Sequence, residues 1–158
     1  MNAVRKLAGI VAAVLVMGRV ALAASSSITQ AEAESAIKSF YHDMESNDLE
    51  KIMAHFDQKV QWYDSGPKDL SFIADTLQQY CAGYPSRSFS IGAVKLKPLP
   101  NSDGVTVNFD LRFFLRNPER DRNQSGHSRV EWDLVKRDGT LKIARFAGTS
   151  ATEPAASP

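Results

Sequence analysis

Residues 40–67 read FYHDMESNDLEKIMAHFDQKVQWYDSGP, and this stretch contains a helix end, a second helix, a strand and a turn. Asn47 suits the end of the first helix, and Asp48 can cap the second. Apolar residues at helical spacing follow Asp48, namely Leu49, Ile52, Met53 and Phe56. The β-branched and aromatic segment 60–63 predicts a strand. Residues 64–67 then predict a turn, because they combine Asp, Ser, Gly and Pro.

The sequence on either side of this stretch predicts two longer helices. Thr29 and Glu32 form a capping box, and Ile28 is placed to pack against the first turn. A third helix should begin at Pro67, because proline is favoured at the first helical position. Its buried stripe would consist of Leu70, Ile73, Leu77 and Tyr80. We expect it to end before Pro85.

From Arg87 onward the apolar residues alternate with polar ones, which indicates half-buried strands. The pattern predicts strands over 88–97, 105–113, 128–136 and 141–147, with turns at 101–104 and 138–139 and a polar loop over 117–126. Helices gathered early and strands gathered late indicate an α+β fold. We therefore expect three N-terminal helices packed on a curved antiparallel sheet.

Both ends of the chain differ from the folded part. Residues 1–23 combine Arg5 and Lys6, an apolar run over 7–17 and the small-residue pattern Ala21-Leu22-Ala23, which is typical of a signal peptide. The apolar run is too short to span a bilayer, so we expect no membrane anchor in the mature form. Residues 24–28 form a linker, 29–149 the domain and 150–158 a disordered tail. The predicted location is periplasmic or secreted.

Composition excludes several classes of function. The chain has 158 residues, with 19 Lys and Arg against 18 Asp and Glu, and 43% of its residues are hydrophobic. This balance lacks the basic footprint of a nucleic-acid binder. After cleavage, 16 basic and 18 acidic residues remain, since 1–23 contains three basic and no acidic residues. The single cysteine, Cys81, can form neither an internal disulfide nor a thiolate cluster. We interpret it as a small apolar residue or an exposed thiol.

The segment 40–67 resembles the NTF2-like superfamily, and within it the SnoaL-like and ketosteroid isomerase-like branch. The resemblance is carried by Asn47-Asp48-Leu49, Ile52, Phe56 and Val60-Gln61-Trp62-Tyr63-Asp64, and it extends more weakly over 29–149. It implies a cone formed by three helices and a curved sheet around a pocket that is open at one end. The superfamily contains isomerases, dehydratases and polyketide cyclases, as well as proteins that only bind.

The resemblance also allows the family's catalytic positions to be compared with this chain. It places Asp64 where the isomerases carry a carboxylate base, and Phe40 where they carry a tyrosine that donates to the oxyanion. Phe40 has no donor, and Tyr41 next to it points elsewhere on the helix. Glu131 roughly matches the second donor, but it alternates with apolar residues that should face inward, so it should face outward.

No motif for a metal or cofactor is present, and we expect neither. His42, His55 and His127 lack the spacing of a metal site, and no partner for a reactive Cys81 is indicated. Several aromatic residues could either line a pocket for an apolar ligand or fill the core, namely Phe40, Tyr41, Trp62, Tyr63, Phe113 and Trp132.

Two polar surfaces have alternative interpretations. His127, Arg129, Glu131 and Asp133 share one strand face, which is either a surface for a protein partner or second subunit, or simply solvated. The arginines at 116, 120, 122 and 129 could hold an anionic group, or belong to a solvated loop.

Three functional hypotheses follow. The first is an exported NTF2-like protein that binds a small, largely apolar molecule or a protein partner without catalysis. The second is an isomerase, dehydratase or cyclase with Asp64 as its general base. The third is an accessory or immunity-type interaction module that acts through its exposed sheet face, with a homodimer as one form.

Overall fold

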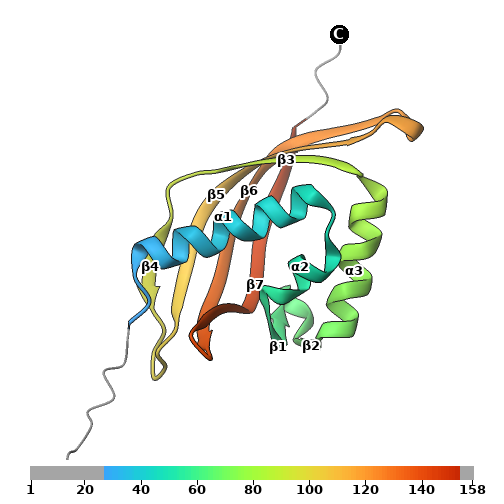
Figure 1. Cartoon of the computed structure of the whole chain (residues 1–158). Coiled ribbons are helices and arrows are strands. Elements are labelled where there is room, and N and C mark those ends of the chain that lie inside the picture. The colour runs from blue at the N-terminus through green and yellow to red at the C-terminus, as the bar shows by residue number, and fades with distance from the viewer. Residues whose placement is uncertain (1–26, 154–158) are drawn as a thin grey trace, which may run out of the picture.

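The computed structural model describes residues 27–153, which form three helices and a seven-stranded sheet (Figure 1). The helices are α1 (Gln30–Ser46), α2 (Leu49–Ala54) and α3 (Leu70–Gly83), and the strands are β1 (Phe56–Trp62), β2 (Pro67–Asp69), β3 (Ser86–Ile91), β4 (Lys95–Pro98), β5 (Val105–Asn117), β6 (Arg122–Arg137) and β7 (Thr140–Glu153). Two short 3-10 helices, η1 (Tyr63–Ser65) and η2 (Pro118–Arg120), complete the set. The predicted signal peptide, residues 24–26 of the linker and residues 154–158 of the tail lie outside the described residues.

The helix ends follow the capping chemistry of the sequence, with two corrections. Thr29 and Glu32 form the expected capping box, and Asp48 caps α2. The prediction that α3 starts at Pro67 was wrong, because Asp69 caps it and Pro67 belongs to β2. Phe56 is the first residue of β1 rather than part of α2. In both cases pairing between strands extended the sheet into residues whose local pattern also suited a helix.

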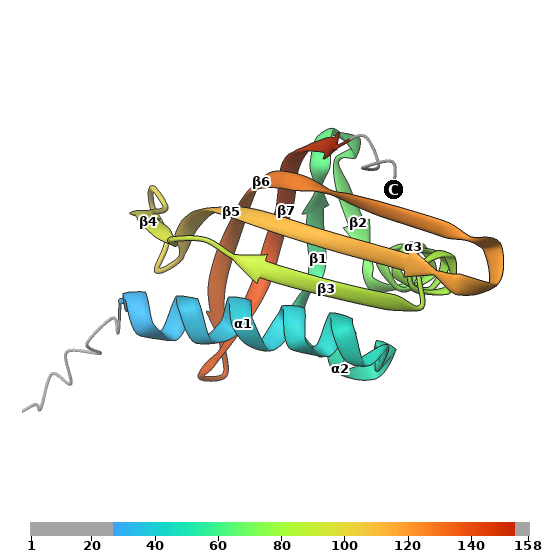
Figure 2. The same cartoon turned by 90° about the horizontal axis from the view of Figure 1, so that it is seen from above.

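The strands form one bent sheet in the order β2-β1-β7-β6-β5-β3, with β4 also paired to β5. All neighbours are antiparallel except β1 and β7, which are parallel. The helix α1 crosses one face of the sheet, and α3 lies beside β1 and β2 at the far end (Figures 1 and 2). This arrangement confirms the predicted α+β cone.

The strands differ in length from their predicted bounds. The predicted strand 88–97 is divided into β3 and β4, and the second half of the predicted polar loop 117–126 belongs to β6. β5 and β6 therefore form a long hairpin that projects beyond the helices (Figures 1 and 2). In this hairpin, polar side chains that face the solvent alternate with side chains that face inward. The predicted loop 117–126 is polar because its outward side chains are solvated. β7 runs to Glu153, into residues for which a disordered tail was predicted.

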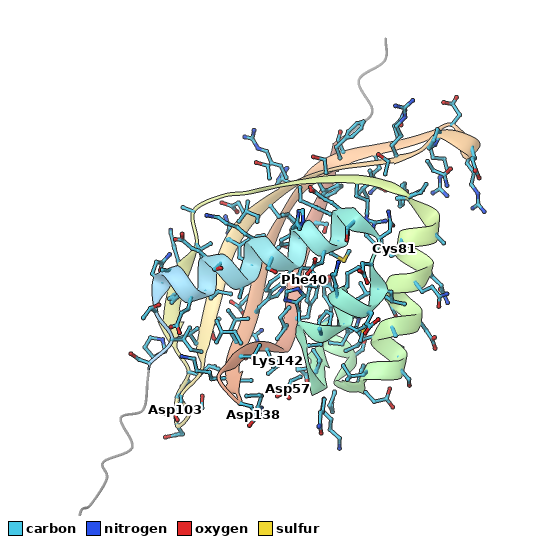
Figure 3. All side chains as sticks on the ribbon, in the orientation of Figure 1. Phe40, Asp57, Cys81, Asp103, Asp138 and Lys142 are labelled. Atoms are coloured by element: carbon cyan, nitrogen blue, oxygen red, sulfur yellow. The ribbon has the colours of Figure 1, made fainter. Side chains whose placement is uncertain are left out.

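The core lies between α1 and the concave face of the sheet. Phe40, from α1, lies over the centre of the sheet (Figure 3) and contacts the rings of Tyr41, Phe56 and Trp132 edge-on. Phe40 and Trp132 are fully buried. Ile28, which we had placed in the linker, is also buried in this core.

A buried arginine ties the helix ends to the sheet. Arg87, on β3, is only 6% exposed and donates to the main-chain carbonyls of Met44, Cys81 and Tyr84. It also donates to the side-chain oxygen of Asn47 at 2.6 Å. Its charge therefore lies at the negative ends of α1 and α3, where a cation is favoured.

The strand β3 forms one edge of the sheet, and a helix covers part of that edge. The carboxylate of Glu45, at the end of α1, accepts a hydrogen bond from the main-chain N–H of Phe89 at 2.8 Å. This donor on the edge strand is therefore already occupied.

Candidate ligand-binding cavity

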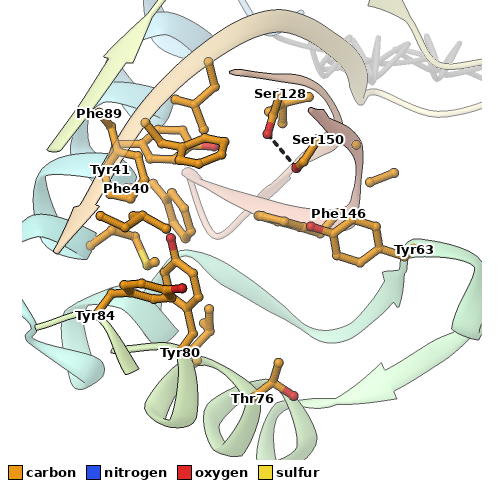
Figure 4. Close-up of a pocket in the computed structure, with 18 of the residues that line it drawn as sticks. Phe40, Tyr41, Tyr63, Thr76, Tyr80, Tyr84, Phe89, Ser128, Phe146 and Ser150 are labelled. Atoms are coloured by element: carbon orange, nitrogen blue, oxygen red, sulfur yellow. Dashed lines mark hydrogen bonds between the residues drawn. The ribbon is translucent and has the colours of Figure 1, made fainter. Parts of the chain in front are cut away.

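A cavity of about 530 Å³ opens between α1, α3 and the sheet (Figure 4). It reaches the surface beside η1 and the end of β7, where Tyr63 and Ser150 are exposed. Its walls consist of Phe40, Tyr41, Met44, Trp62, Tyr63, Thr76, Leu77, Tyr80, Tyr84, Phe89, Leu111, Phe113, Leu115, Gln124, Ser128, Val130, Phe146, Ala147, Gly148 and Ser150. The size is typical of a pocket for a small organic molecule.

One wall of the cavity is formed by stacked rings. Trp62 and Phe146 stack with their ring centroids 4.9 Å apart and their planes 18° apart. Tyr63 meets both rings edge-on or nearly so, at 5.4 Å from Trp62 and 5.7 Å from Phe146. Flat aromatic faces of this kind favour a flat, apolar ligand.

Trp132 belongs to the filled end of the cone and not to the cavity wall. Its ring stacks on Tyr41 at 5.7 Å and meets Phe109 edge-on at 5.2 Å. It is the one predicted ligand-binding residue that is not among the lining residues. Its Nε1–H has no hydrogen-bond partner among the described residues. The other five predicted residues, Phe40, Tyr41, Trp62, Tyr63 and Phe113, all line the cavity.

The polar groups of the cavity are hydroxyls and one amide. The hydroxyl of Tyr84 donates to the side-chain oxygen of Gln124 at 2.8 Å. The hydroxyls of Ser128 and Ser150 lie 2.7 Å apart across β6 and β7 (Figure 4). Within the described part of the chain, the hydroxyls of Tyr41, Tyr63 and Tyr80 form no hydrogen bond. These three hydroxyls are therefore available to a ligand.

Burial keeps these phenols neutral. It raises the pKa of Tyr80 to about 12, against a smaller opposing effect of Arg87. Burial also raises the pKa of Tyr41 well above its ordinary value, and that of Tyr63 to a lesser extent. At neutral pH the three side chains therefore act as hydrogen-bond donors, and they can also accept.

Among the described lining residues, the titratable groups are the tyrosine phenols. No carboxylate, imidazole, thiol, ammonium or guanidinium is found among the described lining residues. Asp64, the predicted general base, is exposed in η1 and does not line the cavity. Glu131 faces outward, as the alternation predicts, and its carboxylate bonds to Arg145 at 2.6 Å.

The backbone of Tyr63 is strained at the cavity opening. Its φ is 47°, a left-handed conformation that side chains other than Asn, Asp and Gly rarely adopt. The following Gly66, with φ of 81°, completes the turn at no such cost. In this backbone conformation the Tyr63 ring packs against Trp62 and Phe146, so the side chain forms part of the edge of the cavity opening.

Sequence reasoning missed several lining residues. Tyr80 and Tyr84 lie at the end of α3, and Ser128, Phe146 and Ser150 face inward from β6 and β7. Tyr80 had been assigned to the buried stripe of its helix, which is the face that borders the cavity. Inward alternation could have identified Ser128, since it shares its face with Val130. No local signal distinguishes a residue above a hollow from one above a filled core.

The remaining candidate residues lie elsewhere. His55 and Asp43 form a partly buried pair, with Nε2 and Oδ2 2.7 Å apart, behind Phe40. Cys81 is half-buried, and burial raises the pKa of its thiol, which makes it less reactive.

No cluster of metal-ligating side chains was found among residues 27–150. No described helix is long and apolar enough to cross a bilayer.

A second hollow lies at the other end of the sheet and differs in character. It has a volume of about 700 Å³, and it lies beside the β6–β7 turn, near Asp57, Asp138 and Lys142 (Figure 3). Arg137 donates two hydrogen bonds to Asp57 there, at 2.8 and 3.0 Å. Its lining holds Lys59, Arg137 and Lys142 with Asp57 and Asp138, and it lacks the stacked rings of the first cavity.

Solved structures with the same architecture are numerous. The chain superposes on a scytalone dehydratase-like protein from Novosphingobium aromaticivorans with a TM-score of 0.71 and 14% identity, over 81% of this chain and 88% of the other. This chain has the NTF2-like fold. A type 2 hexachlorocyclohexane dehydrochlorinase, LinA, gives a TM-score of 0.63 and 14% identity, over 80% and 90% of the two chains.

The similar solved structures also include a protein of no stated activity. An uncharacterised protein with a cystatin-like fold from Caulobacter vibrioides superposes with a TM-score of 0.63 and 12% identity, over 77% of this chain and 88% of the other. No family model and no curated protein matches the sequence of this chain. At these identities the solved structures establish the fold alone.

Proposed function

We propose that the mature, exported chain binds a neutral, largely apolar small molecule in the aromatic cavity and does not convert it. The observation that carries this proposal is the lining itself. The cavity joins stacked rings to unpaired tyrosine hydroxyls, without a carboxylate, imidazole, thiol or amine among the described lining residues. A general base must be deprotonated and within hydrogen-bond reach of the reacting proton, whereas these phenols, whose pKa burial raises, are protonated at neutral pH. Asp64 is exposed outside the lining, so nothing in its position supports the dehydratase-type alternative.

The chemistry of the ligand follows from the walls. A charged ligand would lose its hydration without gaining a counter-charge, which is costly in an apolar site. A flat molecule would contact Trp62 and Phe146, and an oxygen on it would meet the hydroxyl of Tyr41 or Tyr80. We therefore expect a flat molecule with one or two polar oxygens and no formal charge.

A fluorescence titration tests where such a molecule binds. The probe is N-phenyl-1-naphthylamine, a neutral apolar dye, added to the mature protein (residues 24–158). Ser128→Phe places a ring inside the cavity, while Ser128→Ala removes the same hydroxyl and leaves the space open. We expect wild type and Ser128→Ala to bind with similar dissociation constants, and Ser128→Phe to bind at least tenfold more weakly. Equal binding by a folded Ser128→Phe variant would refute the cavity as the site.

The absence of conversion needs its own measurement. Native mass spectrometry of protein from the exported fraction should show a co-purifying mass, and the extracted molecule should be unchanged after incubation with fresh protein. A change of its mass or chromatographic retention, lost in Asp64→Asn, would instead establish the enzyme. Retention of the leader on protein from the cell envelope would contradict export.

A further inference from the structure

The outer face of the β5–β6 hairpin carries a row of side chains that the cavity does not use. Arg112, Phe114 and Arg116 alternate along β5 and are exposed, while Phe113 and Leu115 between them face the cavity. Phe114 is 50% exposed, more than any other large hydrophobic side chain among the described residues. We call Arg112, Phe114 and Arg116 the arginine row.

No ion pair among residues 27–150 neutralises the arginine row. With the side chains of these residues, neither Arg112 nor Arg116 forms an ion pair or a side-chain hydrogen bond. Their neighbours across the sheet include no Asp or Glu: they are Ser86, Ser88 and Ser90 on β3, and Asn123, Ser125 and His127 on β6. Glu119 and Asp121 lie farther out, at the tip, together with Arg120 and Arg122.

The opposite end of the same face is already neutralised. Arg145 donates to Asp133 at 2.8 Å and to Glu131 at 2.6 Å, and Arg129 lies 3.6 Å from Asp110. A second copy that docked through this same strand face would present Asp110, Glu131 and Asp133, which are already engaged by arginines. This favours a different molecule as the source of the complementary charge.

We propose that the arginine row binds an acidic, extended segment of a partner protein. A strand rises about 3.3 Å per residue, and Arg116 follows Arg112 by four residues. The two arginines are therefore about 13 Å apart along β5. An extended segment with the same spacing can place a carboxylate on each guanidinium and an apolar side chain on Phe114 between them. Guanidinium groups suit carboxylates because they donate two parallel hydrogen bonds. The pattern required is acid–x–apolar–x–acid.

Fluorescence polarisation with designed peptides tests this pattern. The probe is a fluorescein-labelled peptide containing Glu-Thr-Phe-Thr-Glu, and the control peptides contain Glu-Thr-Ser-Thr-Glu and Lys-Thr-Phe-Thr-Lys. We expect the first peptide to bind the mature protein with a micromolar dissociation constant that weakens as salt is added. The serine peptide should bind several-fold more weakly, and the lysine peptide should not bind.

Variants of the protein separate the arginine row from charge in general. Arg112→Glu/Arg116→Glu should lower the affinity at least tenfold, and Phe114→Ser several-fold. Lys95→Glu/Lys97→Glu makes the same charge change on exposed residues of β4 and should leave the affinity within twofold. An equal loss in that control would show unspecific attraction and overturn the proposal.

Other occupants give different outcomes, each of which would overturn the proposal. No peptide binding at 1 mM would do so directly. Binding of heparin or phosphatidylglycerol vesicles that depends on Arg112 and Arg116, without peptide binding, would assign the row to a polyanion or a membrane. A dimer in light scattering that Arg112→Glu/Arg116→Glu dissolves would assign it to a second copy. None of these results bears on the cavity, which faces the other side of β5.

Discussion

The two ends of the cone are built from the same kinds of side chain but are packed differently. At the filled end, the ring of Trp132 lies among those of Phe40, Tyr41 and Phe109, with ring centroids 5.0, 5.7 and 5.2 Å away. At the open end, Trp62 and Phe146 stack on each other and their outer faces border the cavity. Aromatic content is therefore similar at the two ends, and the difference between them is the cavity between α1, α3 and the sheet, which borders the rings at the open end.

The comparison also separates stability from function. Rings with neighbours on all sides gain dispersion and burial, whereas rings beside a hollow leave part of that gain for a ligand. We therefore expect substitutions at the filled end to affect stability, and those at the open end to affect binding.

The largest difference is expected between Trp132→Ala and Phe113→Ala. Removing a fully buried indole should lower the free energy of unfolding by about 3–5 kcal/mol, because it loses burial and leaves a void. Phe113 already borders a cavity, so its truncation should cost less than about 1.5 kcal/mol. Urea denaturation measures both. Equal costs would mean that the open end is filled in solution.

The next effect concerns Arg87, which ties the C-terminal ends of α1 and α3 to β3. Arg87→Met should lower the free energy of unfolding by about 3 kcal/mol, because the carbonyls of Met44, Cys81 and Tyr84 lose a buried donor. Arg112→Met on the neighbouring strand is the control, and it should stay within about 0.5 kcal/mol of wild type. Near-equal stability of the two variants would show that Arg87 contributes nothing.

A smaller effect is expected from the phenol of Tyr80. Its pKa is raised to about 12 in the folded protein, against 10 when unfolded. A raised pKa gives stability that is complete below pH 10 and is lost as the pH rises towards 12. Absorbance at 295 nm should therefore show a late-titrating phenol that Tyr80→Phe removes. The variant should also lose less stability above pH 10 than wild type. A wild-type spectrum without late titration would place Tyr80 in water.

The smallest effect lies at the start of α1. Lys136 and Thr29 lower the pKa of Glu32 from 4.5 to about 2. A lowered pKa gives stability that is present above pH 4.5 and is lost as the pH falls to about 2. Glu32→Gln should therefore lower the urea midpoint slightly at pH 6 and not at pH 2. An identical difference at both pH values would rule out this carboxylate as the cause.

The fold was predictable because its signals are local. The capping box at Thr29, the cap at Asp48 and the alternation along β5 each depend on neighbours in sequence. The errors arose where pairing across the sheet outweighed local preference. Phe56 fits the apolar stripe of a helix, and Pro67 fits a helix start, yet both joined strands.

The site was predictable only in part, for a geometric reason. The alternation of polar and apolar residues predicts which side chains face inward, and it identified Trp62 and Phe113 as inward-facing residues. Whether an inward side chain meets another ring or a hollow depends on which side chains of α1, α3 and the other strands lie opposite it, and no local pattern encodes that arrangement. Trp132 and Trp62 both occupy inward positions of strands, and they differ in that Trp132 meets other rings whereas Trp62 borders the cavity. The exposed position of Asp64 depends on η1, whose strained Tyr63 has no sequence signature.

The hydrogen bond from Phe89 to Glu45 has a consequence for how the protein behaves in a crowded compartment. A strand at the border of a sheet is a template on which further chains can grow, and a hollow domain that opens transiently is exposed to that hazard. With this donor held by a carboxylate, an approaching chain meets a negative charge in place of a free amide. The protein can thus keep a loosely packed interior at one end without becoming a seed for fibre growth.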